Sequence, residues 1–212
     1  VNLGMLKNNL LNRKNKNQLI HTLDSEKCER IICSFYRYIK INDITNIRNQ
    51  LYTRLIEINI LGRIYIAKEG INAQVSVPEH NWDKFINALD SFTEFKNLHI
   101  KPAVIHFKYS FIKLIIKVKK KIVSDGLNDD LFISSNVTTY LSATEFNAAM
   151  DNPNSIVVDM RNYYESEVGH FNDAICPDAE TFKDILPMVK EMLNSKKKNK
   201  LLLYCTGGIR CE

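Results

Sequence analysis

The second half of this 212-residue chain ends in Leu202-Leu-Tyr-Cys205-Thr-Gly-Gly-Ile-Arg210-Cys-Glu212, an apolar run followed by a cysteine, two glycines and an arginine. The apolar residues before Cys205 predict a short buried strand that ends at the cysteine. The two glycines that follow allow positive φ angles and close approach of the backbone. Successive backbone N–H groups can therefore curl around the sulfur as an anion-binding nest.

This loop also predicts reactive chemistry at Cys205. Oriented N–H dipoles and the nearby guanidinium of Arg210 favour a thiolate, so we expect a lowered pKa and a nucleophilic sulfur. The predicted cradle consists of Thr206, Gly207, Gly208, Ile209 and Arg210. The alternative is an ordinary buried cysteine at the end of a strand, but the glycines and the arginine together favour the functional interpretation.

The other cysteines are of two kinds. Cys211 lies six residues after Cys205, where it can resolve an oxidised or persulfidated thiol or simply fill the first turn of a following helix. Cys28 and Cys33 are five apart and match no zinc signature, so we assign no metal site. Five cysteines without a disulfide framework or an apolar signal segment indicate reduced thiols and a cytoplasmic protein.

Strands and helices alternate in the second half. Ser142-Ala-Thr-Glu145 is a capping box that opens a helix ending near Asp151. A short buried strand over 155–159, a helix over 182–193 and the apolar strand before Cys205 follow. This order predicts a parallel sheet, and ligands bind at the carboxyl ends of its strands, where Asp159 and Cys205 lie.

The first half shows a different order of elements. An apolar and aromatic strand over 31–38 precedes a helix with apolar residues at helical spacing over 44–58. Two strands then flank a turn at Glu69-Gly70, and a helix that includes Trp82 and Phe85 precedes a strand region over 98–123. This βαββαβ order predicts a ferredoxin-like antiparallel sheet with two helices on one side and an open face that is often a binding surface.

These patterns divide the chain into four segments and place it in the α/β class, with an α+β first part. We expect a poorly ordered or loosely helical basic arm over 1–30 and a ferredoxin-like domain over 31–123. A linker over 124–136 and a parallel-sheet domain over 137–212 complete the prediction.

Charge and hydropathy exclude several classes of protein. The chain is 45% hydrophobic and 25% charged with only 7 Gly and 5 Pro, which excludes collagen-like, wholly disordered and low-complexity proteins. Lysines interrupt the apolar runs well before the ~20 residues that a membrane helix needs, so we expect no membrane partner. The net charge of +5 suits a polyanion such as RNA without demonstrating one.

A row of lysines of the same parity marks the last strand region of the first half. The residues are Lys113, Lys117, Lys119 and Lys121. On one face of a strand they could follow an RNA phosphate backbone. A charged edge that prevents aggregation between strands explains the same row equally well, so both interpretations stay open.

The loop at Cys205 resembles the active-site loop of the rhodanese superfamily, in which four residues separate the cysteine from the arginine. The loops of protein tyrosine phosphatases have five residues there and hold a larger anion. Further likeness lies in Asp159-Met-Arg161, Glu165 and Gly169-His170-Phe-Asn-Asp-Ala174. We expect Asp159, Arg161 and His170 to brace the loop through hydrogen bonds.

The complete set of motifs resembles the bacterial rhodanese-like tRNA uridine(34) hydroxylases. It adds Ser34-Phe-Tyr-Arg-Tyr38, Glu69-Gly-Ile-Asn-Ala-Gln74 and Val123-Ser-Asp-Gly126 to the motifs at Asp159 and Cys205. The resemblance implies oxygen-dependent hydroxylation of the wobble uridine of tRNA to 5-hydroxyuridine, with Cys205 as a persulfide carrier. It implies molecular oxygen as co-substrate, no other evident cofactor, and the anticodon region of tRNA as partner, and it leaves the oligomeric state open.

Members of this family continue past the loop with a helix, a further strand and a cysteine-rich tail. Because this chain stops at Glu212, we expect an incomplete rhodanese-like domain. Two alternatives to the hydroxylase are a plain thiosulfate-type sulfurtransferase and an inactive tRNA-binding remnant of the family.

Overall fold

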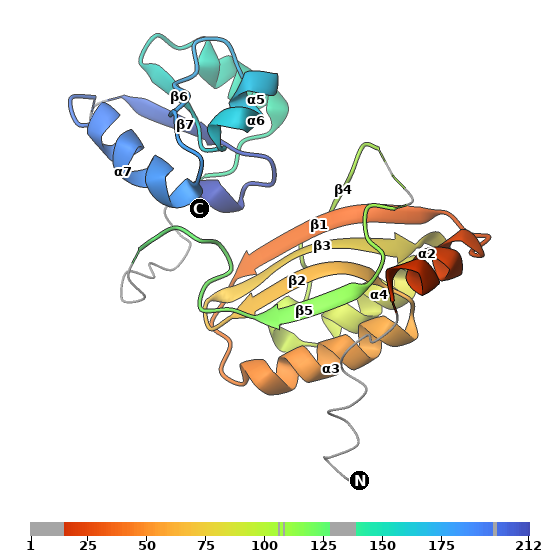
Figure 1. Ribbon diagram of the computed structural model, residues 1–212. Helices are drawn as coiled ribbons and strands as arrows, with labels where there is room; N and C mark the ends of the chain where they lie inside the picture. The colour runs from red at the N-terminus through yellow and green to blue at the C-terminus, as the bar shows by residue number, and fades with distance from the viewer. Residues whose placement is uncertain (1–14, 106, 108, 128–138, 197–198) are drawn as a thin grey trace. The chain divides into compact units, whose positions relative to one another are not determined.

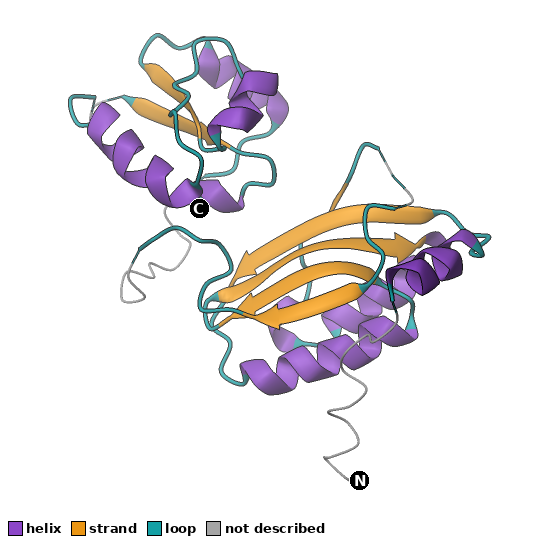
Figure 2. Cartoon of the chain, viewed as in Figure 1, coloured by secondary structure: helices purple, strands orange, loops and turns teal. Residues whose placement is uncertain are grey.

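The computed structural model describes residues 15–105, 107, 109–127, 139–196 and 199–212. Its chain divides into two compact units, Val1–Ile122 and Val123–Glu212, and each has its own sheet, drawn in Figures 1 and 2. None of the helices in the described ranges has the length and apolar character that crossing a membrane requires.

The sheet of the first unit has the predicted split-βαβ core. The strands lie in the order β4-β1-β3-β2-β5, and β3 pairs antiparallel with both β1 and β2. Figure 1 shows α3 and α4 behind this sheet. The elements in chain order are β1 (Arg30–Tyr38), α3 (Ile44–Glu57), β2 (Leu61–Ala67), β3 (Gly70–Pro78), α4 (Trp82–Asp90), β4 (Lys101–Pro102) and β5 (Leu114–Val118). The prediction of a mixed α/β protein with a ferredoxin-like first part is confirmed.

The strand region predicted over 98–123 forms two strands at opposite edges of the sheet. β4 pairs antiparallel with β1, whereas β5 pairs parallel with β2. Pro102 has no N–H group, so the ladder with β1 ends after two residues and one further bond from the Ala103 N–H to the Ile32 carbonyl. The sheet is therefore mixed rather than wholly antiparallel as predicted.

The core of the first unit lies between the sheet and the helices behind it. α3 contributes Ile47, Leu51 and Leu55 at the spacing that predicted one apolar face. Phe85 of α4 is fully buried, and its ring centroid lies 6.0 Å from that of Phe35 in β1. This contact fixes α4 against the middle of the sheet.

We expect Phe85→Ala to lower the free energy of unfolding of the first unit by about 3–5 kcal/mol, because it removes a fully buried ring and leaves a cavity. Urea unfolding followed by the fluorescence of Trp82, which contacts Phe85, measures this loss. Lys84→Ala at an exposed position of the same helix is the matched control. A loss no larger than that of the control would contradict this account of the core.

The predicted basic arm over 1–30 requires correction in its second part. Lys16–Asp24 form helix α2, whose N-terminal Asn15 makes a capping box with Gln18. Leu19 and Leu23 of this helix are buried, and Figure 1 shows α2 in front of one end of the sheet. The capping box and the burial of two leucines stabilise the helix, while residues 1–14 lie outside the described ranges.

The second unit contains the predicted parallel pair of strands. β6 runs over Ser155–Asp159 and β7 over Lys200–Tyr204, with Ser155 opposite Lys200 and Asp159 opposite Tyr204. The capping box opens the helix at the predicted place. The helices are α5 (Ala143–Met150), α6 (Tyr163–Val168) and α7 (Phe182–Met192). The sequence did not predict α6, and residues 128–136 of the predicted linker lie outside the described ranges.

Candidate active site

The loop that follows β7 folds back on the sulfur of Cys205. The Gly208 N–H donates a hydrogen bond to Sγ of Cys205 at 3.0 Å. Gly208 has a φ of 93°, a conformation that favours glycine, whereas Gly207 is not among the residues with positive φ. The Cys211 N–H then bonds the Gly208 carbonyl at 2.9 Å in a short 3-10 turn over Ile209–Cys211. The loop thus points backbone donors at the thiol.

These donors stabilise the thiolate form of Cys205. The hydrogen bond from the Cys211 thiol is the largest influence that lowers its pKa, to about 5. Burial opposes this, and the backbone N–H groups of Arg210, Gly207 and Gly208 reinforce the lowering. By contrast, burial without such donors raises the pKa of Cys33 to about 12. Cys205 is therefore ionised at neutral pH.

Cys211 serves as the proton donor in this pair of thiols. Its hydrogen bond to Cys205 and its burial both raise its pKa well above the ordinary value, so it stays protonated. Both sulfurs are half-buried. The described structure thus places a neutral thiol beside a thiolate, and the role of Cys211 as a resolving thiol stays a prediction.

An ion pair closes the loop on its other side. Arg210 donates to both carboxylate oxygens of Glu165 at 2.8 and 3.0 Å, and the Thr206 hydroxyl donates to the same carboxylate at 2.7 Å. Glu165 belongs to α6, where it also accepts the Asn162 N–H as part of a capping box. One carboxylate therefore positions both the second and the sixth residue of the loop that begins at Cys205.

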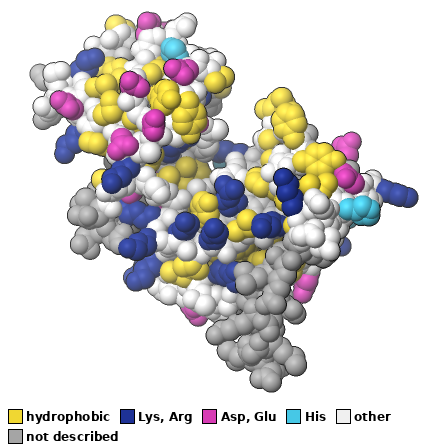
Figure 3. Space-filling view, in the orientation of Figure 1, with side chains coloured by type: hydrophobic (Ala, Val, Ile, Leu, Met, Phe, Trp, Pro, Cys, Tyr) yellow, Lys and Arg dark blue, Asp and Glu magenta, His cyan; other side chains and the backbone are white. Residues whose placement is uncertain are grey.

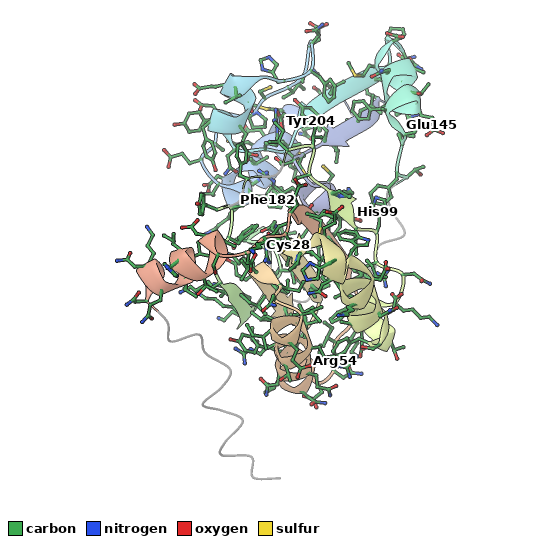
Figure 4. The ribbon with its side chains drawn as sticks, turned by 90° about the vertical axis from the view of Figure 1, so that its right-hand side faces the viewer. Cys28, Arg54, His99, Glu145, Phe182 and Tyr204 are labelled. Atoms are coloured by element: carbon green, nitrogen blue, oxygen red, sulfur yellow. The ribbon has the colours of Figure 1, made fainter. Side chains whose placement is uncertain are left out.

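A second buried carboxylate joins the ends of the two strands. Asp159 at the end of β6 is fully buried and accepts three hydrogen bonds from the Arg161 guanidinium and one from the Tyr204 hydroxyl at 2.7 Å. Arg161 also donates to the Gly169 carbonyl at 2.6 Å. Figure 4 labels Tyr204 within the second unit. This network fixes the strand end from which the loop departs.

Burial opposes ionisation of both carboxyl groups, but their partners outweigh it. Hydrogen bonds from Arg161 and Tyr204 hold the pKa of Asp159 below its ordinary value. Hydrogen bonds from Arg210 and Thr206 do the same for the pKa of Glu165. These partners therefore favour the charged form of both carboxyl groups.

The predicted bracing role of His170 stays a prediction. Its ring Nδ1 lies 2.9 Å from the Ser166 carbonyl near the end of α6, and the residue is exposed. Glu165 accepts hydrogen bonds from two residues of the loop, Thr206 and Arg210. The sequence motif contained Glu165, but its role becomes clear only from its hydrogen bond with Arg210, which lies 45 positions later in the sequence.

The four lysines predicted to share one face of a strand do not all lie within a strand. Lys117 lies within β5, Lys113 immediately precedes the strand, and the Lys119 N–H still bonds the Ile66 carbonyl. Beyond this point the Ile122 N–H bonds the Glu69 carboxylate, and Ile122 is buried. Lys121 therefore lies outside the strand.

No group of three or more His, Cys, Asp or Glu side chains that could hold a metal ion occurs in the part of the chain that the structure describes. The chemistry of the described site is that of a thiolate, a guanidinium and backbone N–H donors.

Comparisons with known proteins bear on both units. Residues 30–122 match the UPF0176 acylphosphatase-like domain, and residues 142–212 match the rhodanese-like domain. Both domains therefore occur one after the other in this chain. The resemblance inferred from the motifs is thereby confirmed, and the Cys205 loop is that of a rhodanese-like domain.

Three curated relatives show how far the likeness extends. The chain is 53% identical over 190 residues to a protein of Leptospira interrogans named tRNA uridine(34) hydroxylase, an alignment that covers 90% of this chain and 52% of that protein. Proteins of the same name from Photorhabdus laumondii and Escherichia fergusonii are 43% and 44% identical over 96% of this chain and 58% of theirs. The chain thus spans little more than half the length of these relatives.

Among solved structures, the BLUF protein BlrB aligns with 45% of this chain and 76% of its own at a TM-score of 0.34 and 13% identity. This likeness carries no argument about fold or function.

We expect Cys211→Ala to raise the pKa of Cys205, because it removes the thiol hydrogen bond that lowers this pKa most. The rate of alkylation of Cys205 by iodoacetamide, measured by mass spectrometry across pH, reports the thiolate. In the unsubstituted protein the rate falls as the pH drops through about 5. In the variant this midpoint moves upward by about one pH unit or more. An unchanged midpoint, equal to that of the control Cys176→Ala, would show that Cys211 does not stabilise the thiolate.

We expect Asp159→Asn to destabilise the sheet of the second unit by about 3 kcal/mol at neutral pH, because it breaks a largely buried ion pair with Arg161. Hydrogen–deuterium exchange of peptides from β6 and β7 measures the loss. In the unsubstituted unit, Asp159 binds protons more readily when unfolded, so its contribution is complete above its ordinary pKa of 3.8 and is lost as the pH falls below it. Equal protection of the variant and of the exposed control Asp178→Asn would contradict this role.

Proposed function

We propose that this chain modifies tRNA by hydroxylating the wobble uridine to 5-hydroxyuridine, with Cys205 as a persulfide carrier. The observation that carries the proposal is a thiolate held by backbone N–H donors and a neighbouring thiol in a rhodanese-like domain. The relatives named tRNA uridine(34) hydroxylase support the choice of substrate. The proposed substrate places the protein in the cytoplasm.

The site is suited to accepting a sulfur atom. The Cys205 thiolate attacks the outer sulfur of a donor such as thiosulfate, a new S–S bond forms on Cys205, and the donor's S–S bond breaks to release sulfite. No net electrons are exchanged with a further reagent. The loop N–H groups remain positioned to stabilise the negative charge of the resulting persulfide. Arg210, held by Glu165, contributes a fixed positive charge beside this anion.

The hydroxylation has its own balance of atoms. One oxygen atom of O₂ replaces the hydrogen at C5 of uridine as a hydroxyl group, and the other leaves as water. This reaction takes up two electrons and two protons in addition to O₂, and the proposal draws them from a pair of thiols that leave as a disulfide. Molecular oxygen is accordingly the co-substrate of the proposal, and the described residues supply the sulfur site.

A plain sulfurtransferase is the second candidate, because the lowered pKa of Cys205 serves transfer of sulfur to any acceptor equally well. The two functions differ in their product. A sulfurtransferase transfers the sulfur of thiosulfate to cyanide and forms thiocyanate, whereas the hydroxylase leaves a new hydroxyl group on tRNA.

The proposal predicts that this chain restores 5-hydroxyuridine in the tRNA of a bacterium that lacks its own tRNA uridine(34) hydroxylase gene. Cys205→Ser abolishes this restoration, because a hydroxyl group is neither ionised at neutral pH nor able to carry a sulfane sulfur. Mass spectrometry of nucleosides from digested tRNA measures the product. Cys28→Ser, at a thiol in the other unit, is the matched control and retains activity.

Two outcomes would contradict the proposal. Restoration by Cys205→Ser would remove the cysteine from the mechanism. Failure of the unsubstituted chain to restore 5-hydroxyuridine, together with a gain of one sulfur atom on Cys205 after treatment with thiosulfate and rapid transfer to cyanide, would establish the sulfurtransferase instead.

A further inference from the structure

The net charge of the chain is divided unevenly between its two units. Residues 1–122 contain 21 Lys and Arg against 10 Asp and Glu, a net charge of +11. Residues 123–212 contain 8 against 14, a net charge of −6. The total of +5 therefore conceals a strongly basic first unit and an acidic second one. A polyanion is attracted to the first unit and repelled by the second.

Within the first unit, the sheet itself is depleted of acidic residues. Strands β1 to β5 contain no Asp or Glu. Their cations are Arg30, Arg37, Arg63, Lys101 and Lys117. Cys33, Phe35, Ala73 and Val75 pack into the core on the helix side. The residues that alternate with them therefore face the other side of the sheet, which we call the open face.

A row of polar side chains crosses this open face. The strand register places Lys101 opposite Ser34, Ser34 opposite Gln74, and Gln74 opposite Arg63. Adjacent strands lie about 4.8 Å apart, so the row spans four strands over roughly 14 Å. It carries a cation at each end and hydrogen-bonding groups between them. Figure 3 shows Lys and Arg side chains gathered over this side of the first unit.

The next row along the strands adds aromatic rings. Tyr36, Asn72, Tyr65 and Lys117 lie opposite one another in the same way. Nζ of Lys101 lies 5.7 Å from the ring centroid of Tyr36, and Nζ of Lys119 lies 5.5 Å from that of Tyr65. Both rings are half-buried. If a base stacks on one of these rings, the nearby ammonium group can therefore reach the phosphate of the same nucleotide.

We propose that the open face binds the single-stranded anticodon loop of tRNA, an inference that rests on the proposed function for its choice of RNA. Tyr36 and Tyr65 stack on unpaired bases, and Gln74 bonds a base edge. Arg63, Lys101, Lys117 and Lys119 contact the phosphates. Half-buried aromatic rings between cations, on strands without Asp or Glu, suit unpaired bases better than a regular duplex, whose bases are stacked on each other.

The test is the affinity of the 212-residue chain for a fluorescent, unmodified anticodon stem-loop with uridine at position 34, measured by anisotropy. We expect Arg63→Glu with Lys117→Glu to weaken binding about tenfold or more at low salt. The logarithm of the binding constant falls linearly with the logarithm of the salt concentration. We expect the same pair to make this slope shallower by about 1.4, or about 0.7 for each phosphate that is no longer neutralised. The matched control is Lys84→Glu with Lys96→Glu, which changes the net charge equally at exposed positions of α4 and the segment after it.

A second pair of variants tests the stacking. Tyr36→Leu and Tyr65→Leu keep an apolar side chain in the sheet but remove the ring, and we expect each to weaken binding between about 5- and 150-fold. Circular dichroism and thermal unfolding establish that each variant is folded. Equal affinity for the anticodon stem-loop and for a fully paired RNA duplex of the same length would overturn the assignment of single-stranded RNA.

The results separate this surface from the chemistry at Cys205. If the two charge-reversal pairs weaken binding equally, or if the tyrosine variants bind normally, the open face is not the RNA site and the proposal fails, whatever the enzymatic activity. If the surface variants weaken binding while the unsubstituted chain binds the stem-loop but yields no 5-hydroxyuridine, the surface stands and the hydroxylase proposal fails.

Discussion

The chemistry of the second unit depends on keeping one partly buried sulfur negatively charged. Burial alone raises the pKa of a thiol, as it does at Cys33, so the thiolate of Cys205 requires donors that replace water. The Cys211 thiol and the backbone N–H groups of the loop supply them. They are fixed in direction by the turn at Gly208, and a fixed donor needs little reorganisation when charge appears on the sulfur.

Two carboxylates, those of Asp159 and Glu165, hold this turn in place. Asp159 joins the ends of β6 and β7 through Arg161 and Tyr204, and Glu165 fixes Arg210 and Thr206. Each carboxylate accepts several hydrogen bonds, which offsets the cost of its burial. The site thus contains two ion pairs, Asp159 with Arg161 and Glu165 with Arg210. Without the ion pair at Glu165, Arg210 would be a flexible side chain with a charge but no fixed direction.

The two units contribute different physical properties to the proposed function. The second unit is acidic overall and holds the guanidinium of Arg210 in the loop that carries the sulfur. The first unit is basic and presents cations and tyrosines on a sheet whose strands lack carboxylates. Such a division suits a large polyanionic substrate that is bound over a broad surface and modified at a single atom.

The sequence by itself determined the local features, because short-range patterns encode them. These features include the strand before Cys205, the capping box at Ser142, the apolar face of α3 and the glycine turn after the cysteine. The three-dimensional fold was needed to show that 98–123 yields strands at opposite sheet edges and that Glu165 binds Arg210 of the loop. It also decided that Lys121 leaves the strand and that Lys16–Asp24 form a packed helix. These outcomes depend on burial and on partners distant in sequence, which no local pattern specifies.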